Sequence, residues 1–393
     1  MLLSILIATL IGVSAGIITG LIPGIHVNLI SVLLLSISPF LLTYVTTLQI
    51  CVIIISMAVT HTFLDTIPST FLGAPEEDTA LSILPGHRLL LEGKGREAVL
   101  LTVVGSLLGL IGSIVAVPII LIVIQKVYFL LKDHIGIILI LLCAFMISRE
   151  KDKAFALILF LLSGTLGLVV FDLPVNEGLF PLFSGLFGIS MLLYSLKNNV
   201  VIPEQHKTEI EVEGKWKAIS CAVIVGWIAS FMPGLGPAQA AAIGSQFVKL
   251  SEKGFLILVG GLSTVNMVLS LVTLYTLEKA RNGAVVAVST ITMITSKEFN
   301  ILLCVALIAG GIATILALKL STVFSTLISK VNYSYLCKGV ITLIIILVFL
   351  ISNWIGLAIL FASTAIGLIP NVKNIARSHM MGCLLIPVIL FFI

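Results

Sequence analysis

Charged residues are scarce in this chain. Only 10% of its 393 residues are Asp, Glu, Lys or Arg, against about 25% in a typical soluble domain. Too little polar surface exists to coat a water-soluble globule, and disorder requires high charge with low hydrophobicity, so both classes are excluded. The 32 glycines and 13 prolines follow no short period, which excludes collagen and a repeat solenoid.

A disulfide framework, a cleavable leader and a strong excess of one charge are also missing. The six cysteines are scattered and form no CxxC pair, so we expect buried apolar cysteines, no metal site and no cofactor. The first residues lack a basic segment and a small-residue cleavage site before a polar domain, which favours a first spanning helix over a signal peptide. A net charge of +4 is too small to indicate nucleic-acid binding.

Long apolar runs are what the chain has instead. Residues 1–64 contain no Asp, Glu, Lys or Arg, and their apolar positions do not alternate with polar ones. A spanning helix needs roughly 20 mainly apolar residues, whereas barrel strands alternate over about 10. The pattern predicts an all-α polytopic membrane protein with about 10–14 transmembrane or re-entrant helices. The stretches 284–296 and 320–336 are ambiguous and fit re-entrant or interfacial segments. The further charge-free runs are 98–125, 178–196, 218–248, 254–277, 299–318 and 339–372.

A polar segment divides the chain almost in half. Residues 197–217, KNNVVIPEQHKTEIEVEGKWK, are the most polar stretch, and we interpret them as a connector between transmembrane repeats 1–196 and 218–393. The two halves resemble each other, because Gly16 to Gly24 matches Gly226 to Gly234, and Ser163 to Gly167 matches Ser363 to Gly367. With an odd number of crossings in each half, the second repeat would be inverted relative to the first, as in many transporters.

Basic residues predict the orientation in the cell membrane. The loops 65–96, 149–153 and 197–217 carry three, three and four Lys or Arg residues. With seven crossings in each half these loops share one side, and the opposite loops 125–133 and 172–177 carry two and none. The basic side is expected to be cytoplasmic.

Two Pro-Gly pairs interrupt long apolar stretches at matching positions of the halves. Proline removes a backbone donor and glycine tolerates unusual dihedral angles, so a helix breaks there. A restarting helix presents free N–H groups and the positive end of its dipole, which suit an anion. The alternative is a kinked helix without a ligand. The predicted substrate-binding residues at these breaks are Pro23, Gly24, His26, Asn28, Pro233, Gly234, Gly236 and Gln239.

A second polar stretch lies at 60–87. Ser69, Thr70 and Gly73 are predicted to line a hydrophilic hairpin tip at the substrate site. His61 and Asp65 share a helix face at spacing i, i+4, which fits either a local hydrogen bond or a proton relay. The acids that follow Pro75 fit an ordinary helix start or cation coupling. The predicted ion-coupling candidates are His61, Asp65, Glu76, Glu77 and Asp78.

The second half supplies one further candidate. Asn266 lies inside an apolar segment beside Ser263 and Thr264, and an amide in hydrocarbon needs partners. An intramembrane enzyme using His61 and Asp65 is an alternative, but the chain has no HExxH, no GxSxG and no recurring Asp-rich motif. We therefore expect no enzymatic activity.

The ordered motifs resemble the large permease subunit of tripartite tricarboxylate transporters. The resemblance is carried by the two Pro-Gly breaks, Gly73-Ala74-Pro75-Glu76, Pro85-Gly86-His87, Lys94-Gly95-Arg96-Glu97-Ala98 and the segment Leu179 to Ile189. Members of that family usually carry paired asparagines and a further Gly-x-Pro-Gly in the second half. Of these features this chain has only Asn266, and it has no proline between 263 and 296. The resemblance therefore does not carry over a tricarboxylate cargo or a need for accessory subunits. A looser similarity links the paired breaks to polyprenyl-phosphate transporters.

These observations lead to one expected function. We expect a secondary active transporter for a small organic anion such as a carboxylate, coupled to H⁺ or Na⁺, because no Asp or Glu lies within either break. A flippase for a lipid phosphate carrier is the alternative. Expected partners are the anionic substrate or a lipid phosphate and membrane lipids, with a homodimer compatible with the sequence and no nucleic acid.

Overall fold

The computed structural model describes residues 2–22, 27–73, 80–197, 202–206, 214–232, 235–280, 282–373 and 375–393. All regular secondary structure in these residues is helical, which confirms the predicted all-α class. Eight helical segments of this described part are long and apolar enough to cross a membrane. In chain order the elements are α1 (Leu2–Leu21), α2 (Val27–Ser36), α3 (Ser38–Leu41), α4 (Thr47–Leu64), α5 (Thr66–Phe71), the 3₁₀ helix η1 (Ala80–Ser82), α6 (Ile83–Leu91), α7 (Gly95–Leu131), η2 (Lys132–His134), α8 (Ile135–Ser148), α9 (Lys153–Asp172), α10 (Leu179–Phe183), the π-helix η3 (Ser184–Ile189), α11 (Ser190–Lys197), α12 (Lys215–Phe231), α13 (Pro237–Phe247), α14 (Glu252–Leu277), α15 (Gly283–Ile291), α16 (Ser296–Ile328), α17 (Tyr333–Lys373), η4 (Arg377–Met381) and α18 (Gly382–Phe392).

Helices α4, α5 and α14 form the interior of the protein. Nearly every side chain of α4, α5 and α14 is buried, while α1, α7, α16 and α17 expose large apolar side chains such as Leu3, Ile122 and Phe361. In a bilayer these exposed apolar faces meet lipid. In these three interior helices, buried polar groups can be satisfied only by other protein groups or by a cavity.

Small residues let the interior helices approach their neighbours closely. Gly12, Gly16 and Gly20 of α1 face α4, where a Cβ added at Gly16 would lie 2.6 Å from Thr60 Cβ. Gly105 of α7 lies directly against the carbonyl of Ile257 in α14. Small residues at spacing four drive helix association in membranes, because apolar side chains gain nothing by leaving lipid.

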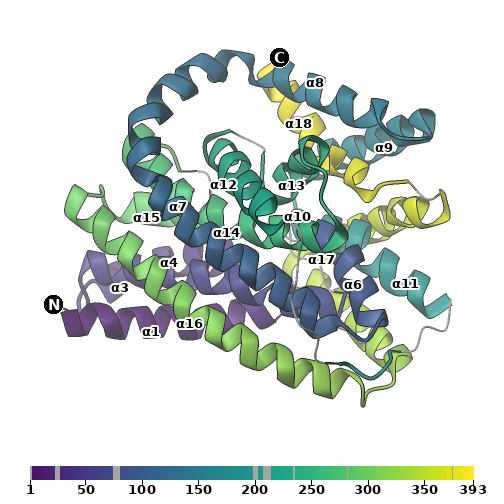
Figure 1. The fold of residues 1–393 in the computed structure, drawn as a ribbon, viewed down its shortest axis with the longest axis horizontal. Helices are drawn as coiled ribbons and strands as arrows, with labels where there is room; N and C mark the ends of the chain where they lie inside the picture. Colours follow the sequence, from purple (N-terminus) through teal and green to yellow (C-terminus); the bar gives the residue numbers. More distant parts are fainter. Residues whose placement is uncertain are drawn as a thin grey trace.

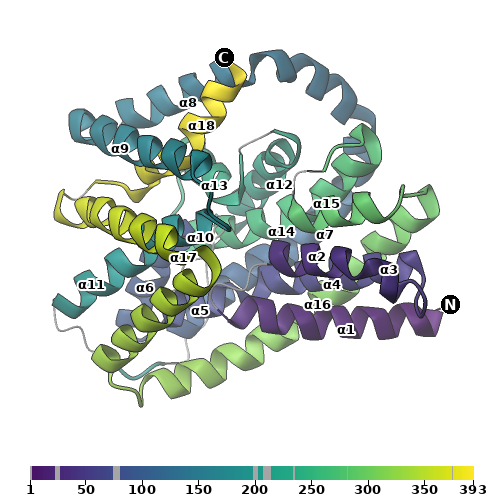
Figure 2. The same ribbon diagram turned by 180° about the vertical axis from the view of Figure 1, so that it is seen from behind.

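The two halves of the chain exchange packing partners. In the first half α7 packs on α14 of the second half, and in return α16 of the second half packs on α4. The pattern recurs further along, because Gly167 of α9 lies against Cys383 of α18 while Gly367 of α17 lies against Ser190, which follows η3. Figures 1 and 2 show α8, α9 and α18 grouped at one edge of the molecule, away from α1. Each half is therefore built onto the other.

The structure resolves the two ambiguous stretches differently. Residues 283–291 form the short helix α15, flanked by extended residues. The stretch 320–336 is instead the end of α16 and the start of α17, so no re-entrant segment lies there. Within the apolar run 339–372, Asn353 has φ 55° and ψ −158° and kinks α17.

Candidate functional site

The two predicted helix breaks lie between described helices. Helix α1 ends at Leu21 and α2 begins at Val27, while α12 ends at Phe231 and α13 begins at Pro237. The described flanks thus agree with an interruption in each half. The site residues that fall outside the described part of the chain are Pro23, Gly24, His26, Glu76, Glu77, Asp78, Pro233 and Gly234.

Helices α4 and α5 carry a buried polar face beside the first break. His61 and Asp65 are 4% and 1% exposed, and the Asp65 N–H donates to the His61 carbonyl at 3.0 Å. The Ser69 hydroxyl donates to the Asp65 carbonyl at 2.8 Å, so the three residues follow one helix face. Gly20, near the end of α1, packs against Leu64 and the backbone of this turn. The structure therefore brings His61 and Asp65 to the point where α1 ends.

Helix α14 carries the corresponding polar face in the second half. Ser263, Thr264 and Asn266 are buried, and the Ser270 hydroxyl donates to the Asn266 carbonyl at 2.6 Å. The hydroxyl oxygens of Thr62 and Thr264 lie 3.0 Å apart, which joins the polar faces of α4 and α14 inside the protein. This contact connects the neighbourhood of Asp65 with that of Asn266.

The first turn of α13 offers hydrogen-bond donors. Gly236 is its N-cap, Pro237 occupies the first helical position, and no side chain caps the turn, so its free N–H groups have no intrahelical acceptors. Gln239 is 1% exposed, and its Nε2 has no hydrogen-bond partner among the described residues. Its Oε1 lies close to Gly236, which holds the amide at the start of the helix. An anion would be satisfied by this set of neutral donors.

The remaining predicted binding residues contact other elements. Asn28, in the first turn of α2, lies against Gly283 of α15, and its Oδ1 has no partner in the described part of the chain. Thr70 packs against Gly86 of α6, and Gly73, at φ 65°, packs against Leu192 of α11. Residues 66–71 form the buried helix α5, so Ser69 and Thr70 lie inside the protein.

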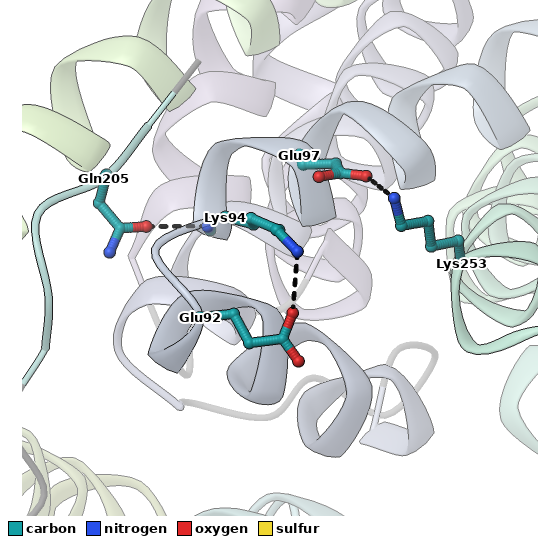
Figure 3. Close-up of polar contacts among 6 residues, drawn as sticks. Glu92, Lys94, Glu97, Gln205 and Lys253 are labelled. Carbon is teal, nitrogen blue, oxygen red and sulfur yellow. Dashed lines mark hydrogen bonds and ion pairs between the residues drawn. The ribbon is translucent and has the colours of Figure 1, made fainter. Parts of the chain in front are cut away.

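Polar contacts around the start of α7 join two of the basic loops, 65–96 and 197–217 (Figure 3). Glu97 of α7, 1% exposed, forms an ion pair with Lys253 of α14. The Gly95 N–H donates to Gln205 Oε1 at 2.8 Å, and Lys94 pairs with Glu92 at 3.2 Å. The 94–98 motif thus anchors the connector and the start of α14, which is a structural role.

Further contacts involve the third basic loop, 149–153. The Arg149 guanidinium donates to the Gln246 carbonyl at 2.8 Å, Glu150 lies 3.0 Å from His379 Nε2, and Arg88 pairs with Glu252 of α14. The loops 65–96 and 149–153 therefore contact the residues on either side of the turn that joins α13 to α14, while the described part of loop 197–217 contacts the start of α7.

A buried histidine lies within the first basic loop, 65–96. His87 of α6 is 3% exposed, and its Nε2 lies 3.0 Å from the Tyr333 hydroxyl of α17. Burial, assisted by the positive charge of Arg377, lowers the pKa of His87 from 6.5 to about 4. His87 is therefore neutral at physiological pH and links α6 to α17.

Two interior groups were not among the predicted site residues. Thr62 and Glu97 have short or charged side chains inside ordinary helical patterns, and what makes them notable is a partner about 150–200 residues away. No spacing in the sequence signals such a contact. Among the described residues, no group of three or more His, Cys, Asp or Glu side chains is placed to hold a metal ion.

Comparisons with known proteins found one matching family and one similar protein. Residues 6–382 match the model of the tripartite tricarboxylate transporter TctA family. An uncharacterized protein of Methanocaldococcus jannaschii is 32% identical over 402 aligned positions, covering 99% of each chain. No solved structure shows significant similarity.

Proposed function

Because the chain belongs to the tripartite tricarboxylate transporter TctA family, we propose that it is the membrane-embedded permease component of a transporter for a small organic anion. The family is one of membrane transporters, and the apolar spanning helices suit that role. A carboxylate is the proposed cargo class. The family description names a three-component system, so accessory components belong to the proposal, contrary to the expectation from the sequence.

The single observation that carries the site is the amide of Gln239. It is buried at the N-terminus of α13, where Nε2 has no partner among the described residues. A buried donor without a partner costs roughly 1–3 kcal/mol, and a bound carboxylate would supply the acceptor. The free N–H groups of the same turn add further donors. Asn28 and Asn266 complete the proposed set, together with Gly24, His26 and Gly234, which lie outside the described residues.

An inverted repeat is the proposed frame for this site. Helices α7 and α16 occupy corresponding places in the two halves, and they run antiparallel: Arg96 Nε donates to Thr322 Oγ1 at 3.1 Å, while Leu110 packs at Gly310. The exchange of partners between α7–α14 and α4–α16 also supports a two-fold relation in the membrane plane. A site between the halves would then open to either side as one half moves against the other.

Coupling to H⁺ or Na⁺ is proposed for the polar face of α4. His61 and Asp65 are ionisable groups inside the membrane region, which are costly to keep there and commonly serve ion pathways. They lie beside the end of α1, where the helical path of the first half is interrupted. The side that carries the three basic loops is proposed to face the cytoplasm.

Uptake into proteoliposomes that contain the chain together with the accessory components of its system tests the proposal. We expect the proteoliposomes to accumulate labelled di- or tricarboxylates under an imposed H⁺ or Na⁺ gradient. Cationic and neutral solutes should not be taken up. Gln239→Ala should raise KM about tenfold or more, because each lost charge-assisted hydrogen bond is worth about 1.5–3 kcal/mol.

Gln49→Ala is the matched control. Gln49 occupies the same third helical position in α4, where it completes a capping box with Thr46. Its loss should lower stability slightly and leave KM unchanged. Equal KM values for the two variants would remove Gln239 from the site, and selective uptake of cations would reject the proposed cargo.

A further inference from the structure

An apolar cleft opens between two helical hairpins. Figure 1 shows α7 and α8 arching over α12 and α13. The cleft between them has a volume of about 690 Å³. Its walls include Leu131 and Leu142 on the arch side, Ile224 and Ile228 of α12, and Phe247 of α13. Lys217 is the one charged residue among the described lining residues.

The walls of this cleft exclude water as its occupant. A buried water needs two to four polar partners, and almost all lining atoms are apolar. Lipid surrounds the exposed apolar faces of α7 and α8 in a bilayer, so hydrocarbon is the solvent that meets the cleft. A chain of methylenes fills such a space without leaving any polar group unsatisfied.

A charged residue marks one end of this otherwise apolar cleft. Lys217 lies one residue after Trp216, which is 63% exposed at the start of α12, and exposed Trp beside Lys is typical of the membrane interface. From Lys217 the cleft follows α12 as far as Met232. That distance is about 22 Å at 1.5 Å per residue, enough to pass from the interface to the middle of a hydrocarbon core about 30 Å thick.

We propose that this cleft binds one hydrocarbon chain of an anionic phospholipid. The phosphate lies at the Lys217 ammonium, at the exposed start of α12. The chain descends along Ile224 and Ile228 towards Met232. It packs on Ile243 and Phe247 of α13, and so it braces the helix whose first turn presents Gln239.

Photolabelling of the full chain tests the hydrocarbon part of this proposal. The protein is reconstituted into phosphatidylcholine vesicles doped with phosphatidylglycerol that carries a photoactivatable group on its acyl chain. We expect labelled peptides from α12 and α13. Ile224→Trp fills the cleft and should remove most of that label, since Ile224 is 57% exposed and lines it. Ile315→Trp on α16, at 56% exposure, is the matched control and should retain the label.

A second pair of variants tests the charged end of the cleft. These variants change exposed lysines and do not fill the cleft. Lys217→Gln should reduce the preference for phosphatidylglycerol over phosphatidylcholine label roughly fivefold, and Lys215→Gln should reduce it less. Three outcomes would overturn the proposal. These are equal cleft labelling in Ile224→Trp and Ile315→Trp, no headgroup preference in the wild type, and cross-linking of the cleft to another polypeptide that excludes lipid.

Discussion

The hydroxyl groups of Thr62 and Thr264 lie 3.0 Å apart, one on α4 and the other on α14. These two helices are the most deeply buried in the described part of the chain, and the contact joins the two halves at their centre. A hydrogen bond between hydroxyls holds two helices in register without introducing a charge into the membrane interior.

Valine substitutions test what this contact contributes. Thr62→Val should destabilise the protein by about 1 kcal/mol, because it leaves the Thr264 hydroxyl without its acceptor. Thr264→Val should cost less, since the Thr62 hydroxyl still donates to the Val59 carbonyl at 2.9 Å. The double variant should cost little more than Thr62→Val alone. Thermal unfolding in detergent provides the measurement, with Thr165→Val on the exposed face of α9 as the control. Strictly additive losses would show that the two hydroxyls act independently.

The close approach of α7 to α14 makes a sharper prediction. Gly105→Ala places a methyl group against the Ile257 carbonyl and should destabilise the protein by about 1–3 kcal/mol or more through overpacking. Gly311→Ala in α16 meets no atom within 4 Å and should be neutral or stabilise by up to about 1 kcal/mol. The melting temperatures of the two alanine variants should therefore move in opposite directions, and a parallel shift would contradict the close packing.

Acid should weaken the protein partly through His87. Burial lowers the pKa of this imidazole in the folded protein from 6.5 to about 4, so between these values the unfolded chain binds the proton more readily. The contribution of His87 to the free energy of unfolding is therefore fully present above pH 6.5. As the pH falls towards 4, this contribution, about 3 kcal/mol, is lost. His87→Gln should remove that part of the pH dependence, measured as melting temperature against pH. His134→Gln, at an exposed position, should leave the acid-dependent loss intact.

Asn353 stores backbone strain at the kink of α17. Its φ of 55° with ψ of −158° belongs to a region that only glycine occupies readily. Asn353→Gly should stabilise the protein by roughly 1 kcal/mol, and Asn353→Ala should destabilise it. A scan of melting temperature distinguishes the two. If Asn353→Gly lowers the melting temperature, the asparagine side chain stabilises the folded protein by more than the backbone strain destabilises it.

Part of this architecture follows directly from the sequence. Charge-free runs predict spanning helices because lipid admits few ionised groups, and the interruption at residue 353 is visible as a polar Ser-Asn pair between two apolar segments. The matched glycines Gly16 and Gly226 indicate close helix packing, and both do face a neighbouring helix. Local pattern is sufficient for such features.

Other features depend on contacts that no local pattern encodes. The exchange of α7 and α16 between the halves, the ion pair of Glu97 with Lys253, and the cleft beneath the α7–α8 arch arise from long-range packing. At the candidate site, the polar types of Asn266 and Gln239 were recognisable because amides are rare in apolar runs. That the Gln239 Nε2 has no hydrogen-bond partner among the described residues became visible only with the fold.

The exchange of packing partners has a consequence for biosynthesis. When the first half leaves the ribosome, α4 and α7 have entered the bilayer, but the helices that cover them, α16 and α14, have not been translated. The glycine face of α7 and the hydroxyl face of α4 must wait in lipid, or beside the insertion machinery, until α14, which begins at Glu252, and α16, which begins at Ser296, have been made. A chain stopped at the connector would therefore lack the surfaces that bury it and would be recognised by membrane proteases.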